Sequence, residues 1–379
     1  MKILHTADWH LGKKVNGISR LDEQKAILQE LIGIVEKNSV DVVLVAGDIF
    51  NVSTAPQEVY ELFYETVLAL SNSGNRAVIV VNGNNDEGSR LTASKQFAEQ
   101  FNIFLIDSLD YEVITSIPKG KAVQVLDIGK GYIKIEKGGE RAIVCYLPFP
   151  SRKLLSEAKM HDATKDEKIK KLIERSTINF EAGAVNIFLS HIQVEATAGD
   201  DSNLTHKFDI SVLPKKADYV ALGGFHDMGQ VEGMDTVYYS GSTTQINPKE
   251  QPEKYVIILN TENSKIVNKE FVKIKNARRI VTFSVKNYED ALKKLSGNEA
   301  HIIEMSFVEG TISKEEISEL KKNFQNIAQF NIHTKLNTKT DKQISELLPT
   351  TAFSEFHQEQ TGEKPNEIMQ AVFKEIFNK

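Results

Sequence analysis

The sequence predicts an α/β fold in which short buried strands alternate with amphipathic helices. Between residues 2 and 259, short apolar runs recur, and each is bounded by small and polar residues. Two segments that lie between the first three of these runs carry apolar residues spaced three and four apart, as in helices that pack one face against a sheet. Because the runs are apolar almost throughout, we expect their strands to be buried on both faces.

The predicted elements follow one another as expected of crossover units. Strands are expected at residues 2–5, 41–46, 77–82, 141–147, 185–190, 219–222, 237–240 and 255–259. Apolar positions at helical spacing predict a helix after each of the first two strands, carried by Leu28, Leu31, Ile32 and Val35 and by Val59, Leu62, Phe63, Val67 and Leu70.

From about residue 278 the pattern changes, which predicts a separate small α+β unit. Strands are expected at 279–285, 301–308 and 328–336, and helices at 288–295 and 314–322. We therefore divide the chain into domains 1–275 and 276–342 and a helical segment 343–379. The last segment has an apolar stripe, which fits either a helix docked on its own protein or one that binds a partner.

Composition excludes several protein classes. With 41% hydrophobic and 26% charged residues, the chain is neither disordered nor membrane-like. No apolar run approaches the ~20 residues that span a bilayer, and the start MKILHTADWH lacks a signal-peptide layout, so we expect a cytoplasmic protein without a membrane partner. The single cysteine, Cys145, lies in an apolar run and predicts core packing, not redox chemistry. The net charge of −6 argues against a generally basic nucleic-acid binder but not against a local basic surface.

Several predicted strands end in side chains that bind divalent metals. Functional sites of open α/β sheets form at strand ends, so position makes these residues informative. Each one alone is a weak signal, but their occurrence in this order predicts a metal centre. The set is Asp8, His10, Asp48, Asn84, Asp86, His191 and His226.

The residue types fit two-metal chemistry. Two cations roughly 3.5–4 Å apart need one carboxylate that bridges them, and Asp48 is the natural bridge. Imidazoles and a carboxamide add ligand atoms without adding charge, so positive charge remains to polarise a phosphodiester and to acidify water. The sequence therefore predicts hydrolysis of a phosphate ester. We expect Gly47 and Gly83 to allow sharp turns with positive φ before the ligands.

The spaced motifs D-x-H, G-D and G-N-x-D, followed by later single histidines, resemble those of the calcineurin-like metallophosphoesterases. The match covers residues 1 to about 260 and implies a four-layer sandwich of two packed sheets flanked by helices. The segments HTADWHLGK at 5–13 and YSGS at 239–242, with the small unit that follows, are similar to the SbcD-type subunits of DNA double-strand-break nucleases. In that family the small unit is a capping domain that helps to hold DNA over the metals.

The resemblance implies a role for each matching position. One divalent ion would be held by Asp8, His10, Asp48 and His226, and the other by Asp48, Asn84 and His191. Manganese is the expected metal, since it suits oxygen and nitrogen ligands.

Two positions depart from the family pattern. The motif G-H-x-H has Gly224 in place of its first histidine, although another register pairs His226 with that position. The motif G-N-H-D has Asn85 in place of the histidine that assists proton transfer. General acid–base assistance contributes roughly 10²–10⁴-fold, so we expect reduced activity. We assign the catalytic positions to Asn85 and Asp86; water, Asp86 or Asp227 could fill the gaps.

The implied function is that of a metal-dependent exonuclease and endonuclease acting on DNA ends and hairpins in repair and recombination. The implied partners are DNA, a second copy of the chain and an SbcC-type coiled-coil ATPase. The chain has no G-x-x-x-x-G-K-[ST] loop, so an ATP-driven step would come from another chain. Two alternatives stay open: a catalytically inactive scaffold subunit that binds DNA ends, and a small-molecule phosphodiesterase of the same fold.

Overall fold

The computed structural model describes residues 1–113, 117–195, 207–308 and 311–333, together with 353, 357–358, 364–366 and 369–370. The chain forms two compact units. The first comprises Met1–Thr282, Gly297–Glu304 and Gln325–Gln329, and the second Phe283–Ser296, Met305–Phe324 and Phe330–Lys379. The domain boundaries expected after residues 275 and 342 stay predictions. The predicted helical segment 343–379 lies almost wholly outside the described residues.

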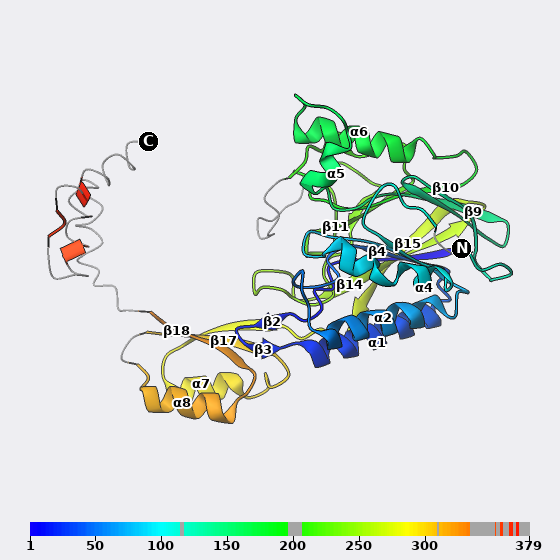
Figure 1. Cartoon of the computed structure of the whole chain (residues 1–379). Coiled ribbons are helices and arrows are strands. Elements are labelled where there is room, and N and C mark those ends of the chain that lie inside the picture. The colour runs from blue at the N-terminus through cyan, green and yellow to red at the C-terminus, as the bar shows by residue number, and fades with distance from the viewer. Residues whose placement is uncertain are drawn as a thin grey trace. The chain divides into compact units, whose positions relative to one another are not determined.

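The first unit contains a six-stranded sheet in the order β15-β14-β1-β4-β5-β6. Figure 1 labels three of its strands, β4, β14 and β15. Its strands are β1 (Lys2–Thr6), β4 (Val42–Ala46), β5 (Ala77–Val81), β6 (Ile103–Ile106), β14 (Lys254–Glu262) and β15 (Lys265–Ile274). Strands β1, β4, β5 and β6 are parallel, whereas β14 is antiparallel to both β1 and β15. The predicted crossover helices are confirmed as α1 (Leu21–Lys37) and α2 (Gln57–Ser71).

A seven-stranded sheet has the order β12-β13-β11-β10-β9-β8-β7. Its strands are β7 (Gln124–Gly129), β8 (Tyr132–Lys137), β9 (Glu140–Leu147), β10 (Val185–His191), β11 (Tyr219–Gly223), β12 (Gly229–Gln230) and β13 (Val237–Tyr239). Strands β9, β10, β11 and β13 are parallel, and the outer strands are antiparallel to their neighbours. All eight strands predicted for the first domain are therefore present.

The side chains of β4 show how the layers pack. Val42, Leu44 and Ala46 lie in the apolar core between the two sheets, and Val43 and Val45 lie in the core under α1 and α2. This alternation follows from the period of two in a strand. A third core lies between the second sheet and α6 (Lys165–Thr177). The order helix, sheet, sheet, helix confirms the predicted four-layer sandwich.

The later part of the chain contains a three-stranded sheet in the order β16-β17-β18. The elements are β16 (Ile280–Val285), α7 (Tyr288–Leu295), β17 (Ile302–Val308), α8 (Lys314–Asn323) and β18 (Ile327–His333). This confirms the predicted succession of strand, helix, strand, helix and strand. Among the described residues, no helix has both the length and the apolar character needed to cross a membrane.

Candidate metal centre

The predicted metal ligands lie at or just after the carboxyl ends of β1, β4 and β5 in one sheet and of β10 and β11 in the other. Parallel pairing brings the ends of neighbouring strands to one edge of each sheet. Two groups of side chains each place their ligand atoms within 4.8 Å of one another, Asp8 with His10 and His226, and Asp8 with Asp48 and His191. All five residues are buried.

Three of the predicted ligands have strained backbone conformations. Asp8, His10 and Asp48 have φ angles of 51°, 45° and 50°, in the left-handed region that non-glycine residues seldom adopt. Two hydrogen bonds between the loops fix this conformation, from Asp8 N to Gly47 O (2.9 Å) and from His10 N to Asp48 O (3.0 Å). Such strain is common at functional sites, where surrounding structure maintains it.

The two glycines before the ligands are required for different reasons. Gly47 has a φ of 84°, as predicted, and a β-carbon there would also lie 2.5 Å from His191 Nδ1. Gly83 does not have a positive φ, so the expectation of a left-handed turn is wrong at this position. Instead, a β-carbon on Gly83 would overlap Oδ1 of Asp48. Gly83 therefore provides space for the predicted bridging carboxylate.

Four donors surround the first candidate position. His10 Nε2 lies 3.1 Å from His226 Nε2 and 3.7 Å from Asp48 Oδ2. The Nδ1 of His226 lies 2.9 Å from Glu250 Oε1. Because a carboxylate only accepts, Nδ1 donates, and the lone pair of His226 is on Nε2. With the Asp8 carboxylate, this gives two oxygen and two imidazole donors, which fits a divalent cation.

The second candidate position has three protein donors. His191 Nδ1 donates to Ala46 O at 2.8 Å, so the lone pair is on Nε2, which lies 3.0 Å from Asn84 Oδ1 and 3.5 Å from Asp48 Oδ1. The structure thus brings together Asp48, Asn84 and His191, as expected. Gly224 offers no side chain, and its N–H donates to Asp8 Oδ1 and Oδ2 at 3.2 and 3.0 Å. The donor set therefore fits one cation fully and a second one incompletely.

Residues 1–228 match the calcineurin-like phosphoesterase family. The chain belongs to this family. Among similar proteins, three carry the name of the SbcD subunit of the nuclease SbcCD, which confirms the resemblance found in the sequence. The Bacillus subtilis protein is 35% identical over 256 residues, which cover 64% of this chain and 61% of that protein, less than two thirds of its length. The proteins of Staphylococcus epidermidis and Staphylococcus saprophyticus are both 27% identical, over 78% of this chain and 75% and 74% of their own lengths.

Asn85 and Asp86 both make contacts within the loops of this phosphoesterase that carry the predicted metal ligands. Asn85 donates from its backbone N to Asp48 Oδ1 at 3.0 Å and from Nδ2 to Asp48 Oδ2 at 2.7 Å. Asp86 accepts from the backbone N of Gly83 (2.8 Å), Ile49 (3.1 Å) and Phe50 (2.9 Å). These contacts join the loops after β4 and β5. A catalytic part for either residue stays a prediction.

The electrostatics of the phosphoesterase site favour a cation. Burial, together with the nearby charge of Asp48, raises the pKa of Asp8 well above its ordinary value. Burial likewise raises the pKa of Asp48 and of Asp86 to about 6. Burial lowers the pKa of His191 to about 4 and that of His10 well below its usual range, so both imidazoles are neutral near pH 7. The neutral imidazoles are in the protonation state that a metal requires. The raised pKa values of the carboxyl groups show that their negative charge is poorly compensated, so a bound cation would stabilise the ionised carboxylates.

Sequence reasoning missed two buried residues next to the ligands. Glu250 contacts His226, and Lys254 Nζ lies 2.9 Å from Glu250 Oε2. Burial opposes ionisation of Glu250, but the hydrogen bond from His226 and the charge of Lys254 outweigh it and lower its pKa to about 2. Neither residue belongs to a motif, so the sequence carries no signal for them.

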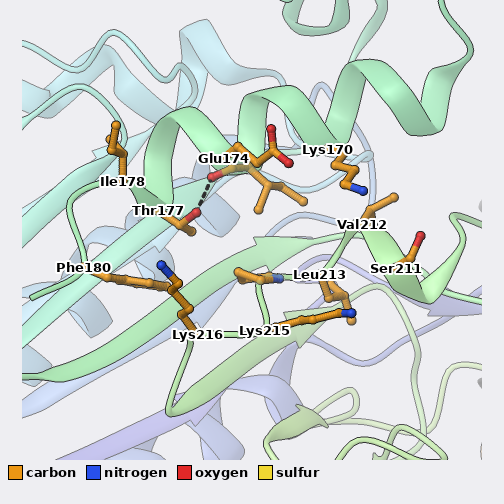
Figure 2. Close-up of a pocket in the computed structure, with 12 residues that line it drawn as sticks. Lys170, Glu174, Thr177, Ile178, Phe180, Ser211, Val212, Leu213, Lys215 and Lys216 are labelled. Carbon is orange, nitrogen blue, oxygen red and sulfur yellow. Dashed lines mark hydrogen bonds between the residues drawn. The ribbon is translucent and has the colours of Figure 1, made fainter.

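A separate pocket of about 460 Å³ lies between α6 and the segment around η2 (Ile210–Val212). Figure 2 shows Lys170, Lys215 and Lys216 with Phe180 and Ile178 at its walls. Its lining includes no histidine and no predicted metal ligand. The pocket therefore lacks the donors expected of a phosphoesterase metal centre.

Proposed function

We propose that this phosphoesterase is a metal-dependent nuclease subunit that hydrolyses phosphodiester bonds in DNA. The observation that carries the proposal is the convergence of Asp8, His10, Asp48 and His226, with His191 beside them, at the strand ends of both sheets. The name shared by the similar proteins, which describes each as part of the nuclease SbcCD, supports DNA as the substrate.

The proposed ligands divide between two positions. Asp8, His10, Asp48 and His226 would hold one divalent cation, and Asp48 with Asn84 and His191 a second, weaker one; Mn²⁺ suits these oxygen and nitrogen donors. When bound, the cations would supply Lewis-acid polarisation of the phosphodiester and lower the pKa of water. The strained loops would hold the donors in place before substrate arrives. Asn85 and Asp86 would complete the site, and an amide at 85 cannot transfer a proton as an imidazole does, so turnover would be slow.

The proposed assembly follows from the description of the similar proteins as one subunit of a complex. We extend it to a homodimer that works in the cytoplasm with an SbcC-type coiled-coil ATPase. In this proposal, residues 276–342 cap the DNA over the metal centre. The terminal segment 343–379 docks on the partner through its apolar stripe.

A second candidate is a subunit that binds DNA ends without cutting them. Two observations favour it, namely that Gly224 contributes no ligand to the second position and that the Asn85 side chain is bound to Asp48. Both features would weaken catalysis while leaving the fold intact, because the second position lacks a ligand and an amide at position 85 cannot transfer a proton.

The deciding experiment measures cleavage of end-labelled duplex and hairpin DNA by the chain with its ATPase partner, in Mn²⁺ and in chelator. For a nuclease, Asp8→Ala should reduce Mn²⁺-dependent cleavage by at least about 10²-fold, because a ligand to the cation is lost. The matched control is Asp22→Ala, an exposed carboxylate in the first turn of α1.

Each outcome selects one function. If the wild type and Asp8→Ala both bind DNA ends and neither cleaves them, the chain is a scaffold subunit and not a nuclease. Metal-dependent hydrolysis of bis(p-nitrophenyl) phosphate without cleavage of DNA would instead indicate a small-molecule phosphodiesterase.

A further inference from the structure

A buried carboxylate sets the proton position on one proposed metal ligand. Glu250 Oε1 lies 2.9 Å from His226 Nδ1, and both side chains are at most 10% exposed. The imidazole must donate in this contact, because the ionised carboxylate only accepts. Its lone pair is therefore on Nε2, the atom that lies 3.1 Å from His10 Nε2 in the metal centre.

All acceptor positions of Glu250 are used. Oε1 accepts from His226 Nδ1 and from Asn247 Nδ2 (3.0 Å), and Oε2 accepts from Lys254 Nζ (2.9 Å) and from Ile246 N (2.8 Å). Four donors thus fill the four acceptor directions of a carboxylate. This arrangement fixes the carboxylate in one orientation.

Lys254 completes the arrangement from the first residue of β14. Its side chain is 1% exposed, and Nζ also donates to His226 O at 3.1 Å. A buried ion pair carries a desolvation penalty that its Coulomb attraction often fails to offset, so its presence is weak evidence of a stabilising role. Here the lysine binds both the backbone of the ligand residue and the carboxylate that orients its ring.

We propose that Glu250, supported by Lys254, is a positioning residue that keeps His226 in the tautomer with its Nε2 lone pair directed at the cation. The inference rests on the proposed metal-dependent function. Partners that orient a ligating histidine typically contribute 10–100-fold to metal affinity.

Glu250→Gln is the sharpest test because it keeps the shape of the side chain. Two donors, Lys254 Nζ and Ile246 N, face the Oε2 position, so the amide oxygen of glutamine would remain there. The amide NH₂ would then face His226 Nδ1 and require it to accept. The proton of His226 would move to Nε2, toward the metal. The matched control is Glu253→Gln, a partly exposed carboxylate of the same loop that pairs with Arg279.

Two measurements on the full-length proteins give independent results. Mn²⁺ affinity, measured by electron paramagnetic resonance, should fall about 10–100-fold in Glu250→Gln and stay unchanged in Glu253→Gln. In the metal-free proteins, ¹⁵N NMR of His226 should show the Nδ1–H form in the wild type and the Nε2–H form in Glu250→Gln. Unchanged affinity together with an unchanged tautomer would overturn the proposal.

The experiment separates this inference from the proposed function. A wild-type protein that binds no Mn²⁺ would contradict the metal-dependent function, whereas the tautomer would still report on Glu250. If Glu250→Gln is unstable because Lys254 loses its counter-charge, the double variant Glu250→Leu/Lys254→Met removes both charges together and leaves His226 Nδ1 without its acceptor. A folded double variant with wild-type Mn²⁺ affinity would likewise overturn the proposal.

Discussion

Asn85 holds both oxygens of the Asp48 carboxylate, with its backbone N 3.0 Å from Oδ1 and its side-chain Nδ2 2.7 Å from Oδ2. A carboxylate has about four acceptor directions, so these two bonds leave one direction on each oxygen for a cation. One free direction faces His10, whose Nε2 lies 3.7 Å from Oδ2, and the other faces His191, whose Nε2 lies 3.5 Å from Oδ1. Asn85 therefore positions the carboxylate without blocking it, but its amide cannot exchange a proton.

Asn85→His should increase DNA cleavage by at least about tenfold at saturating Mn²⁺. The imidazole would restore part of the roughly 10²–10⁴-fold that general acid–base assistance contributes. Single-turnover rates measure the effect without interference from product release. Asn75→His, on an exposed turn, is the matched control and should leave the rate unchanged. An unaltered rate in Asn85→His would mean that proton transfer at this position does not limit cleavage.

Gly224→Ala should destabilise the protein by about 1–3 kcal/mol, because Gly224 has a φ of 102°, where a β-carbon is strained. The same strain would accompany the histidine that the family motif has at this position. Urea unfolding in chelator gives the free energy. Gly33→Ala is a control with the opposite expected effect. Gly33 lies in α1 with open space around it, so alanine there should raise the free energy of unfolding by roughly 0.5–1 kcal/mol. Equal effects of the two substitutions would refute the argument from φ.

Asp86→Asn tests whether Asp86 is a structural or a catalytic residue. An amide oxygen can replace only one oxygen of a carboxylate that accepts three backbone N–H groups. We expect a loss of roughly 1.5–3 kcal/mol in the free energy of unfolding, the range for hydrogen bonds to charged groups. Asp162→Asn, at an exposed position, should have no effect. Full stability with lost cleavage would instead support catalysis by Asp86.

Most strands whose residues are all buried were predictable, with the four-residue strand β6 as the exception. Every residue of β4 and β5 is buried, and both strands stand out as continuous apolar runs. The sequence did not predict β6, β7, β8, β12 or β15. In β15, at the edge of the first sheet, only Ile274 is buried and most other residues are polar. Charged residues are common on edge strands and remove the apolar signal on which the prediction depends.

The candidate site was predictable to the extent that its residues directly follow strands. Asp8, Asp48 and Asn84 each lie within four residues of a strand end, so motif order located them. Glu250 contacts His226 across 24 positions in sequence, and only the folded loop before β14 brings them together. Orienting partners of this kind follow from tertiary packing, which no local pattern encodes.

His5 is buried on β1, and its pKa differs between the folded and the unfolded chain. Its Nδ1 lies 3.0 Å from the Tyr219 hydroxyl and its Nε2 3.2 Å from Leu222 O. Burial lowers the pKa of His5 from 6.5 to about 3, although the contact with Leu222 O opposes the shift. Between these two values the unfolded chain binds a proton that the folded chain does not. Stability must therefore fall as the pH falls from about 6.5 toward 3.

The wild type should accordingly lose about 2 kcal/mol more stability than His5→Gln between pH 7 and pH 5. Glutamine can keep both hydrogen bonds but does not titrate. Urea unfolding in chelator at pH 7, 6 and 5 measures the difference, and the carboxylates of the metal centre cancel because both proteins contain them. His161→Gln, at an exposed position, should follow the wild type. Parallel curves for the wild type and His5→Gln would show that His5 binds its proton equally in both states.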